Sequence, residues 1–272
     1  MRIYTKAGDL AFEEFTFPDG QPHFKLLTWE RDFPAVTIEL AIKSPTDLFR
    51  ARMAKQVLRA SGFYNINLDI RYLLGARMDR PIDNHQPFTL ALIAQYLVGG
   101  FSKIRVLDCH SAVGVNLLGA SNVLPYEQVK QVIHTLGDVL AVIPDAGARE
   151  RVDNLTRGLV DDVVQAYKQR DTLTGRLSGP EVEGVSRVKG REVLIIDDIC
   201  DGGATFTQLT KVLKQGGATK VHLFVTHLIM SKGNKVLTDG GIDRVFCTDS
   251  FRDWSMIPFT NISSIPVQME KM

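Results

Sequence analysis

Residues 193–205 read Val-Leu-Ile-Ile-Asp-Asp-Ile-Cys-Asp-Gly-Gly-Ala-Thr, and this stretch decides the fold class. Its first half is an almost wholly apolar run, which is typical of a strand covered on both faces of a parallel sheet. The acids and glycines that follow predict a tight turn into a helix. The backbone amides of residues 201–205 would face an anion, because a helix N-terminus attracts phosphate and glycine allows close approach.

The two acids of this stretch require a different ligand. Asp197 and Asp198 would repel a phosphate, so they suit ribose hydroxyls or a hydrated magnesium ion, which prefers carboxylate oxygens and retained water. The hydroxyl of Thr205 adds one donor to the phosphate site. The alternative is a tight strand–helix turn with surface acids and no ligand. The hydrophobic strand directly in front of the turn makes this alternative the weaker interpretation.

The rest of the chain alternates between β-branched apolar runs and segments of helical periodicity. The expected strands are Ala35–Ile42, Ile66–Leu73, Lys103–Cys109, Asp138–Pro144, Glu192–Asp198, Lys220–Leu228 and Arg244–Asp249. The expected helices are Ser44–Ser61, Pro87–Val98, Pro125–Leu136, Ala148–Arg157, Thr205–Gln215 and Lys232–Asp239. This alternation predicts an α/β fold in which right-handed crossovers join parallel strands.

Two such runs of strands and helices meet at Gly137-Asp138, where we place a domain boundary. We expect residues 1–137 and 138–272 to form two domains, each with a central, mostly parallel sheet flanked by helices. Residues 168–189 differ, because they are polar, rich in cations and interrupted by Gly175 and Ser178-Gly179-Pro180. Long segments of this kind are usually lids or binding loops, so we expect a flexible loop here.

Composition argues against several classes of protein. The 32 lysines and arginines balance 31 aspartates and glutamates, so no global positive field favours nucleic acid. The three cysteines form no CxxC pair, which argues against a disulfide framework or structural zinc and fits a reducing cytoplasm. No apolar run approaches the roughly 20 residues that a membrane span needs. We expect a cytoplasmic protein with no nucleic-acid or membrane partner.

Residues 193–205 resemble the phosphoribosyl-diphosphate signature of type I phosphoribosyltransferases and of ribose-phosphate diphosphokinases. Four further segments are similar to motifs of the diphosphokinases alone. They are Phe15–Gln21 (F-x-D-G-E in the family), Gly75–Arg80 (Y-A-R-Q-D-R), Leu107–Ser111 (D-x-H) and Ile143–Gly147 (S-P-D-x-G). Because all five occur in the family's order, the chain is identified as a member of the diphosphokinase family, similar to its short, phage-type relatives.

The resemblance implies two tandem phosphoribosyltransferase-like domains and transfer of the β,γ-diphosphate of ATP to the anomeric hydroxyl of ribose 5-phosphate, with release of AMP. It implies ATP contacts for Phe17, Asp19, Gln21, Arg77, Asp79 and His110. It implies sugar-phosphate contacts for Asp197, Asp198, Cys200, Asp201, Gly202, Gly203, Ala204 and Thr205. His110 and Asp145 would hold the catalytic Mg²⁺ with the ATP phosphates.

Two further expectations follow from the resemblance. Lys168 and Arg170, with Arg176 as a third candidate, match the position of the catalytic flexible loop, whose cations neutralise charge on the transferring group. Family members are dimers or hexamers in which the segment equivalent to Phe15–Gln21 can serve a neighbouring subunit. The resemblance therefore implies a homo-oligomer.

The chain also departs from the family pattern. Gln21 replaces a glutamate, Met78 replaces a glutamine, and the loop 201–205 lacks the threonine of the D-T-G-G-T form. One hydroxyl donor to the 5-phosphate is thereby lost, which leaves ADP-ribose, the acceptor of some short relatives that serve NAD salvage, as an alternative substrate. A phosphoribosyltransferase and an inactive associated subunit are the remaining alternatives.

Overall fold

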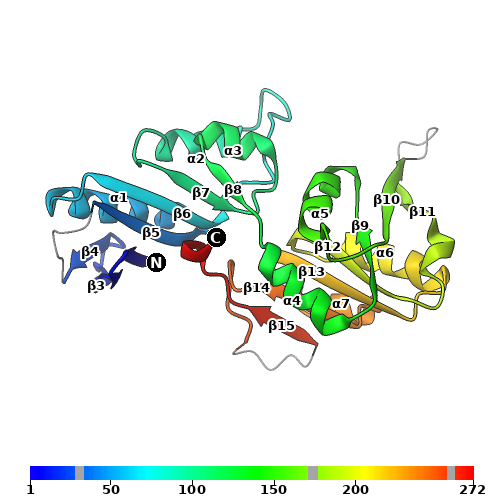
Figure 1. Ribbon diagram of the computed structural model, residues 1–272. Helices are drawn as coiled ribbons and strands as arrows, with labels where there is room; N and C mark the ends of the chain where they lie inside the picture. The colour runs from blue at the N-terminus through cyan, green and yellow to red at the C-terminus, as the bar shows by residue number, and fades with distance from the viewer. Residues whose placement is uncertain (28–33, 171–176, 256–260) are drawn as a thin grey trace. The chain divides into compact units, whose positions relative to one another are not determined.

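The computed structural model describes residues 1–27, 34–170, 177–255 and 261–272, with the backbone alone at residues 168–170, 177 and 178. These residues form two compact units (Figure 1). Unit 1 contains Met1–Val123 and Gln268–Met272, and unit 2 contains Leu124–Val267. Each unit has its own parallel sheet and its own core, as the alternation of the sequence predicts.

Unit 1 is built on a six-stranded sheet in the order β2-β1-β5-β6-β7-β8. The strands are β1 (Arg2–Thr5), β2 (Gly8–Asp9), β5 (Ala35–Ile42), β6 (Asn65–Leu73), β7 (Ile104–Leu107) and β8 (Ser121–Val123). β5 to β8 are parallel, whereas β1 runs antiparallel to β5. The connecting helices are α1 (Pro45–Ala60), α2 (Thr89–Leu97) and α3 (Ala112–Leu118). Helix α3 was not among the expected helices.

Helix α1 shows how the sequence sets one boundary. Ser44 is the N-cap, and its hydroxyl accepts a hydrogen bond from the Asp47 amide at 3.3 Å. Asp47 returns the bond, because its Oδ2 accepts from the Ser44 amide at 2.9 Å. This reciprocal capping box satisfies amides that the first turn leaves without partners. Pro45 occupies the first helical position, where no amide is needed.

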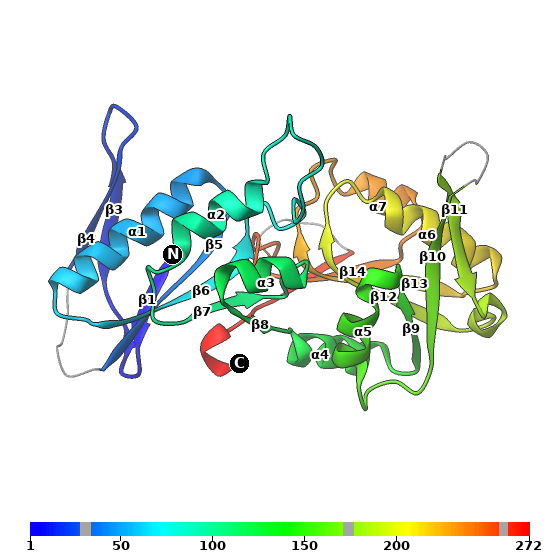
Figure 2. The ribbon, with the colours of Figure 1, turned by 90° about the horizontal axis from the view of Figure 1, so that it is seen from above.

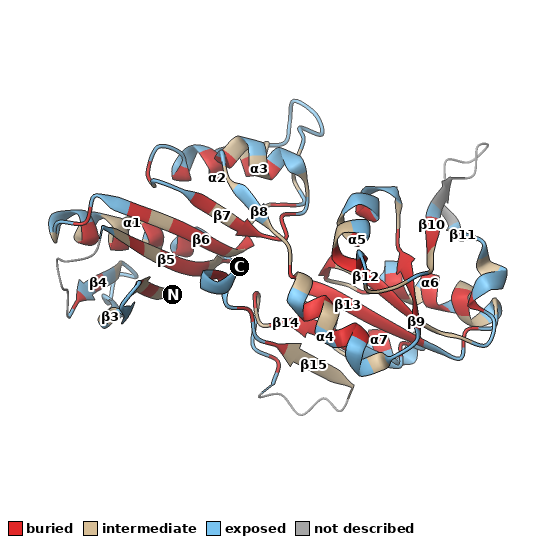
Figure 3. Cartoon of the chain, in the orientation of Figure 1, coloured by how far each residue is buried: buried red, intermediate tan, exposed pale blue. Residues whose placement is uncertain are grey.

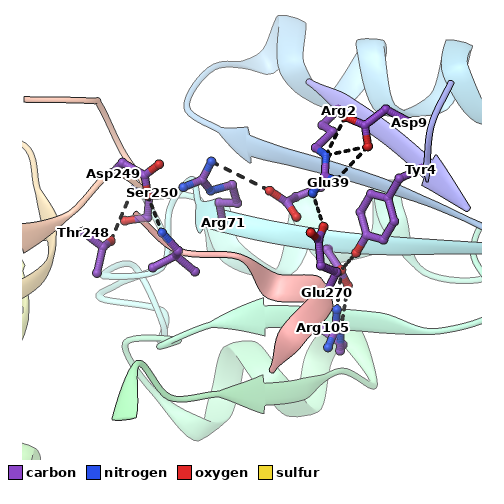
Figure 4. Close-up of polar contacts among 12 residues, drawn as sticks. Arg2, Tyr4, Asp9, Glu39, Arg71, Arg105, Thr248, Asp249, Ser250 and Glu270 are labelled. Carbon is purple, nitrogen blue, oxygen red and sulfur yellow. Dashed lines mark hydrogen bonds and ion pairs between the residues drawn. The ribbon is translucent and has the colours of Figure 1, made fainter. Parts of the chain in front are cut away.

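A buried acid joins three strands of unit 1 (Figure 4). Asp69 on β6 is 1% exposed, and its carboxylate accepts from Arg105 Nε at 2.8 Å and from the Tyr4 hydroxyl at 2.8 Å. Burial and this bond to a carboxylate raise the pKa of Tyr4, so the phenol stays protonated and donates. The acid is therefore a structural connection between β1, β6 and β7.

Unit 2 contains a seven-stranded sheet in the order β11-β10-β9-β12-β13-β14-β15. Its strands are β9 (Val139–Ile143), β10 (Val163–Arg170), β11 (Leu177–Glu183), β12 (Glu192–Cys200), β13 (Lys220–Leu228), β14 (Arg244–Thr248) and β15 (Ile262–Ile265). All neighbours are parallel except β10 and β11. The helices are α4 (Tyr126–Leu136), α5 (Arg149–Thr156), α6 (Ala204–Gln215) and α7 (Lys235–Asp239), with short 3-10 turns η1 (Ala146–Ala148) and η2 (Val185–Val188).

The expectation of a flexible loop over residues 168–189 was largely wrong. Much of this stretch is the antiparallel pair β10–β11 and the turn η2, and residues 171–176 lie outside the described part of the chain. The breaks that suggested a loop are compatible with a strand because β11 is an edge of the sheet. An edge strand tolerates proline and glycine, and here it contains Gly179 and Pro180.

The compact units also divide elsewhere than at the expected boundary between residues 137 and 138. The division falls after Val123, because α4 packs Val129, Val132 and Ile133 into the core of unit 2. The C-terminal tail does not stay in unit 2, since residues 268–272 belong to unit 1. There Met269 is fully buried and Glu270 forms an ion pair with Arg2 (Figure 4).

Burial follows the sheets, as Figure 3 shows in red along the central strands of each unit. β9 is buried at every position, which explains its unbroken apolar run in the sequence. The functional side chains therefore have to come from strand ends and loops. Among the helices that the structure describes, none is long and apolar enough to cross a membrane.

Candidate functional site

The turn between β12 and α6 is shaped by a glycine. Gly203 is the N-cap of α6 and has a φ of +77°, a left-handed conformation that side-chain-bearing residues rarely adopt. A Cβ at this position would lie 2.7 Å from Leu237 Cδ2, so Gly203 also lets α7 pack closely. The amides of the first turn of α6 are thereby presented at the carboxyl end of β12. That is the geometry that binds phosphate.

A second turn lies against this loop. Cys200 is the last residue of β12, and its carbonyl accepts hydrogen bonds from the amides of Ile229 at 2.8 Å and Met230 at 3.2 Å. These bonds hold the start of the β13–α7 turn beside the loop. A Cβ at Gly202 would lie 3.6 Å from Lys232 Cδ and 3.9 Å from Lys232 Nζ. An exposed ammonium group therefore lies next to the glycine loop, where it would favour an anion.

The side chain of Cys200 faces the protein interior. It is fully buried, and burial together with the nearby acids Asp197 and Asp201 raises the pKa of its thiol to about 12. Such a thiol stays protonated and is a poor nucleophile. Of the residues expected to contact the sugar phosphate, Cys200 thus has a positioning role, through the two hydrogen bonds to its carbonyl.

The two acids at the end of β12 share one arginine from α5. Arg151 Nη1 lies 3.6 Å from Asp197 Oδ1, and Arg151 Nη2 lies 3.5 Å from Asp198 Oδ2. The exposed fractions of the side chains are 11% for Arg151, 17% for Asp197 and 4% for Asp198. Asp197 is therefore the acid with more access to a ligand, and Asp198 the one more firmly enclosed.

Their surroundings make it unfavourable for Asp197 and Asp198 to be ionised at the same time. Burial, followed by repulsion from Asp198, raises the pKa of Asp197 well above its usual value, while Arg151 opposes that rise. Asp197 Oδ1 also accepts a hydrogen bond from the Asp198 amide at 2.9 Å. One arginine thus offsets part of the repulsion between two adjacent carboxylates. Perturbed carboxyl pairs of this kind are frequent at functional sites.

Asp145 lies at the end of β9 in unit 2, half-buried. Its Oδ1 accepts from the Ala148 amide at 3.2 Å, so it caps the η1 turn that leads into α5. A Cβ at Gly147 would lie 3.3 Å from this same oxygen, which explains why a glycine follows. Asp145 therefore lies at a strand end, as expected, on the rim where open parallel sheets bind ligands.

His110 lies at the corresponding end of β7 in unit 1. It is exposed, and the residue two positions before it, Asp108, has a φ of 41°, which is unusual outside glycine. The backbone at Asp108 is held by a hydrogen bond from its amide to the Val123 carbonyl at 2.8 Å. The Ser111 hydroxyl, which follows His110, is buried without a hydrogen-bond partner among the described residues. A constrained backbone and an unsatisfied hydroxyl are both common beside ligand sites.

The expected ATP residues form two groups within unit 1. Arg77 and Asp79 lie in the β6–α2 loop, where Arg77 is exposed and Asp79 half-buried. Phe17, Asp19 and Gln21 lie at the tip of the hairpin formed by β3 (Phe12–Thr16) and β4 (Pro22–Leu26). Both ribbon views show this tip well away from the β6–α2 loop (Figures 1 and 2). The fold of unit 1 therefore does not bring the two groups together.

The hairpin tip is stiff and aromatic. A β-turn closes with the Gly20 amide bonded to the Phe17 carbonyl at 2.8 Å, and Asp19 Oδ1 accepts from the Gln21 amide at 3.0 Å. Phe17 is 41% exposed and packs edge-on against Phe15 at 4.9 Å between ring centroids. An exposed aromatic pair on a rigid turn is suited to stacking on a planar ligand or a partner.

The expected loop cations are only partly described. Lys168 and Arg170 lie on β10, where Lys168 is opposite Pro180 and Arg170 opposite Leu177, with a bulge between them. Arg176 lies outside the described residues.

The donors available for Mg²⁺ can be tested by their chemistry. In the described part of the chain, no group of three or more His, Cys, Asp or Glu side chains gathers into a cage. Magnesium usually retains several waters and takes one or two carboxylates plus substrate phosphates, so it needs no such cage. The Asp145 carboxylate fits this habit. An imidazole is a less usual ligand for magnesium, so His110 is the weaker of the two donors.

Sequence reasoning missed two residues that the structure places at the β12–α6 loop. Arg151 looked like one of several charges on an amphipathic helix, and only the fold brings it to Asp197 and Asp198. Lys232 lies 30 positions from Gly202 in sequence and reaches it through the turn held by Cys200. Arg151 could have been proposed as a site residue from the sequence, because it follows Asp145 by six residues within the same strand–helix unit.

Known proteins resemble this chain along most of its length. A model of the phosphoribosyl synthetase-associated domain matches residues 158–267. The ribose-phosphate pyrophosphokinase of Pyrococcus furiosus is 26% identical over 92% of this chain and 88% of its own. That of Mycoplasmopsis pulmonis is 31% identical over 73% of this chain and 63% of its own. The sequence resemblance is therefore not confined to the β12–α6 motif.

The fold has a solved counterpart. The crystal structure of phosphoribosylpyrophosphate synthetase from Mycobacterium smegmatis superimposes with a TM-score of 0.79, at 19% sequence identity, over 94% of this chain and 86% of that one. This agreement confirms the expected architecture of two phosphoribosyltransferase-like halves. The sequence relatives that span both halves place the chain in the ribose-phosphate pyrophosphokinase family.

Proposed function

We propose that this protein transfers the β,γ-diphosphate of ATP to the anomeric hydroxyl of ribose 5-phosphate, forming phosphoribosyl diphosphate and AMP. The observation that supports this most strongly is the likeness over 92% of the chain to a protein named ribose-phosphate pyrophosphokinase. The anomeric oxygen forms a bond to the β-phosphorus, the bond from that phosphorus to the oxygen bridging to the α-phosphate breaks, and AMP leaves with that oxygen. The anomeric hydroxyl gives up its proton.

The sugar phosphate would bind at the β12–α6 loop. The 5-phosphate would accept hydrogen bonds from the amides of residues 202–205 and from the Thr205 hydroxyl, while Lys232 supplies a positive charge next to Gly202. Asp197 would accept hydrogen bonds from the ribose hydroxyls, since it is the more exposed acid of the pair. Asp198 would hold Arg151, which keeps the pair ionised.

The nucleotide would bind through residues of unit 1. Phe17 would stack on adenine, with Asp19 and Gln21 at its edge. Arg77 and His110 would contact the phosphates, and Asp79 would be a further contact to the nucleotide. Because the hairpin tip stands apart from the β6–α2 loop in unit 1, we propose that a hairpin serves the nucleotide of a neighbouring subunit. The protein would then function as a dimer or a larger homo-oligomer.

The reaction develops negative charge that the site has to offset. The Asp145 carboxylate and the His110 imidazole would each be a donor for Mg²⁺, which neutralises the ATP phosphates when bound. Lys168 and Arg170 on β10, with Arg176, would neutralise the transferring diphosphoryl group and orient it for in-line attack.

The test is direct. The purified protein is mixed with ATP, MgCl₂ and ribose 5-phosphate, and products are followed by ³¹P NMR and mass spectrometry. We expect AMP and phosphoribosyl diphosphate in equal amounts, with no AMP when the sugar is omitted. An Asp197→Asn variant serves as a folded control of low activity. AMP release that ignores ribose 5-phosphate but responds to ADP-ribose would contradict the proposed acceptor.

A further inference from the structure

Unit 1 contains two stretches of chain that are rich in cations and contain no acidic residue. Residues 48–68 and residues 84–107 contain no aspartate or glutamate, yet they carry four arginines or lysines on α1 and two more before and on β7. Three of them, Arg52, Lys55 and Arg59, follow one another along α1 at spacings of three and four residues, which puts them on one side of the helix.

These three cations contact aromatic rings where ion pairs would be expected. Arg59 Cζ lies 4.7 Å from the centroid of the Tyr64 ring, and Lys55 Nζ lies 5.7 Å from that of Phe101. Arg52 Cζ lies 5.8 Å from the centroid of the Tyr96 ring. Within the described ranges none of the three forms an ion pair, so no carboxylate of the described residues offsets their mutual repulsion.

Two of the three cations, Lys55 and Arg59, line a hollow at the amino ends of β6 and β7, and Arg52 lies beside it against Gly100. This hollow has a volume of about 280 Å³ and is lined by Lys55, Arg59, Tyr64, Gly100 and Phe101, among others. A Cβ at Gly100 would collide with Arg52 Nη1, so the glycine lets that guanidinium lie against the backbone. Arg52 Nη1 is itself buried and has no hydrogen-bond partner in the described structure. Buried donors of a guanidinium are normally satisfied, and this unsatisfied one lies next to Gly100, which lines the hollow.

Repulsion among the three cations also affects the pKa of Lys55. Burial, and then repulsion from Arg52 and Arg59, lowers the pKa of Lys55. An anion that enters the hollow would remove this repulsion. A single phosphate carries at most about two negative charges and leaves part of the cluster unneutralised, whereas a diphosphate group carries about three. Guanidinium groups also favour phosphate geometry, because they donate in parallel pairs.

We propose that this hollow is a binding site for a diphosphate group, separate from the site at the carboxyl ends of the strands. The expected ATP residues Arg77 and His110 follow β6 and β7, whereas the hollow lies where these strands begin. Free pyrophosphate and a nucleoside diphosphate both carry this group, so the cations recognise the chemistry that the two share.

The test measures Lys55 itself, so it is independent of catalysis. The folded protein is treated briefly with acetic anhydride, with and without pyrophosphate, and acetylation of each lysine is quantified by peptide mass spectrometry. Bound diphosphate should lower the reactivity of Lys55 about tenfold, since a rise of one unit in its pKa removes about nine-tenths of the neutral amine. Lys130, an exposed lysine on α4 paired with Glu127, is the internal control and should not change.

Variants and other anions complete the experiment. Arg52→Gln combined with Arg59→Gln should abolish protection of Lys55, whereas Arg59→Lys should retain most of it; thermal unfolding verifies that each variant is folded. Protection by ADP at lower concentration than by pyrophosphate would identify a nucleotide as the ligand, and the reverse order would identify free pyrophosphate. Unchanged acetylation of Lys55, equal protection of Lys130, or protection that survives the double substitution would each overturn the proposal.

Discussion

Arg151 Nη2 lies 3.5 Å from Asp198 Oδ2, and the other terminal nitrogen of the same guanidinium lies 3.6 Å from Asp197 Oδ1. The arginine therefore bridges two acids that are adjacent in the chain and both largely enclosed. Since two neighbouring carboxylates repel each other, their ionised state depends on this one cation. The bridge connects α5 to the end of β12, the element on which the proposed sugar site is built.

Replacing Arg151 should alter the pH dependence of sugar use. Without the guanidinium the pKa values of the acidic pair rise, so the carboxylates become protonated at higher pH and accept fewer hydrogen bonds from ribose. In Arg151→Met we expect the acidic limb of kcat/KM for ribose 5-phosphate to move to higher pH, with KM raised about tenfold near neutrality for a loss of about 1.4 kcal/mol. Arg157→Gln, at the end of the same helix, is the control. An acidic limb that stays in place would contradict the role of Arg151.

Asp197→Asn should make the protein more stable and less active. The pKa of Asp197 is raised in the folded state, so the native protein binds this proton more readily than the unfolded chain does. Ionised Asp197 therefore costs stability above its folded pKa, and the cost disappears as pH falls toward the usual aspartate value. We expect the variant to gain about 1 kcal/mol in free energy of unfolding at pH 8 and almost nothing at pH 4.

The measurement is urea unfolding at several pH values, with Asp243→Asn for comparison. Hydrogen bonds and ion pairing with Lys214 lower the pKa of Asp243 despite its partial burial, so its replacement should destabilise at pH 8. Equal signs for the two variants would refute the assignment.

Gly202 and Gly203 offer a matched pair of substitutions. Gly203→Ala forces a residue with a side chain to adopt a φ of +77° and places its Cβ 2.7 Å from Leu237. We expect a loss of about 1 to 3 kcal/mol in stability and a weaker phosphate site. Gly202→Ala meets only ordinary contacts at 3.6 Å and should leave stability almost unchanged. Thermal unfolding of both variants, side by side, checks this difference.

Lys232→Gln should weaken binding of the sugar phosphate and leave ATP unaffected. The ammonium group lies near Gly202 and contributes attraction to the 5-phosphate, which salt screens. We expect KM for ribose 5-phosphate to rise several-fold, by about 1 kcal/mol, and to become less dependent on ionic strength. Lys235→Gln, three residues further on α7, is the matched control. A change in KM for ATP instead would assign Lys232 elsewhere.

Complementation can test whether the hairpin serves another subunit. Phe17→Ala and His110→Ala should each be nearly inactive, and neither should lose much stability, because both residues are exposed. A mixed dimer would contain one site with an intact hairpin and an intact histidine. Co-refolded equal mixtures should therefore regain about a quarter of wild-type activity. If the mixture stays inactive while size-exclusion chromatography shows mixed dimers, the hairpin serves its own chain.

Local sequence signals predicted the central parallel strands and most helices, but not the parallel strands β8, β10 and β15. The apolar runs at Val193–Ile196 and in β13, and the Ser44–Asp47 start of α1, are cases in which chain-local physics determines the structure. Polar edge elements were less predictable. β11 contains Gly179 and Pro180, which have low strand propensity. It forms a strand because it pairs with β10.

The residues of the candidate site were likewise predictable only in part. The glycine loop after β12 was visible in the sequence, because its geometry arises from adjacent residues. Arg151 and Lys232 were not, since they reach that loop from α5 and from the β13–α7 turn. Only tertiary packing determines such neighbours.

The return of the chain to unit 1 has a consequence for synthesis on the ribosome. Met269, which is fully buried, and Glu270, which pairs with Arg2, are translated after all of unit 2. The first half of the nascent protein therefore emerges before the residues that complete its interior, and it must wait, incompletely packed, until the second half has left the exit tunnel.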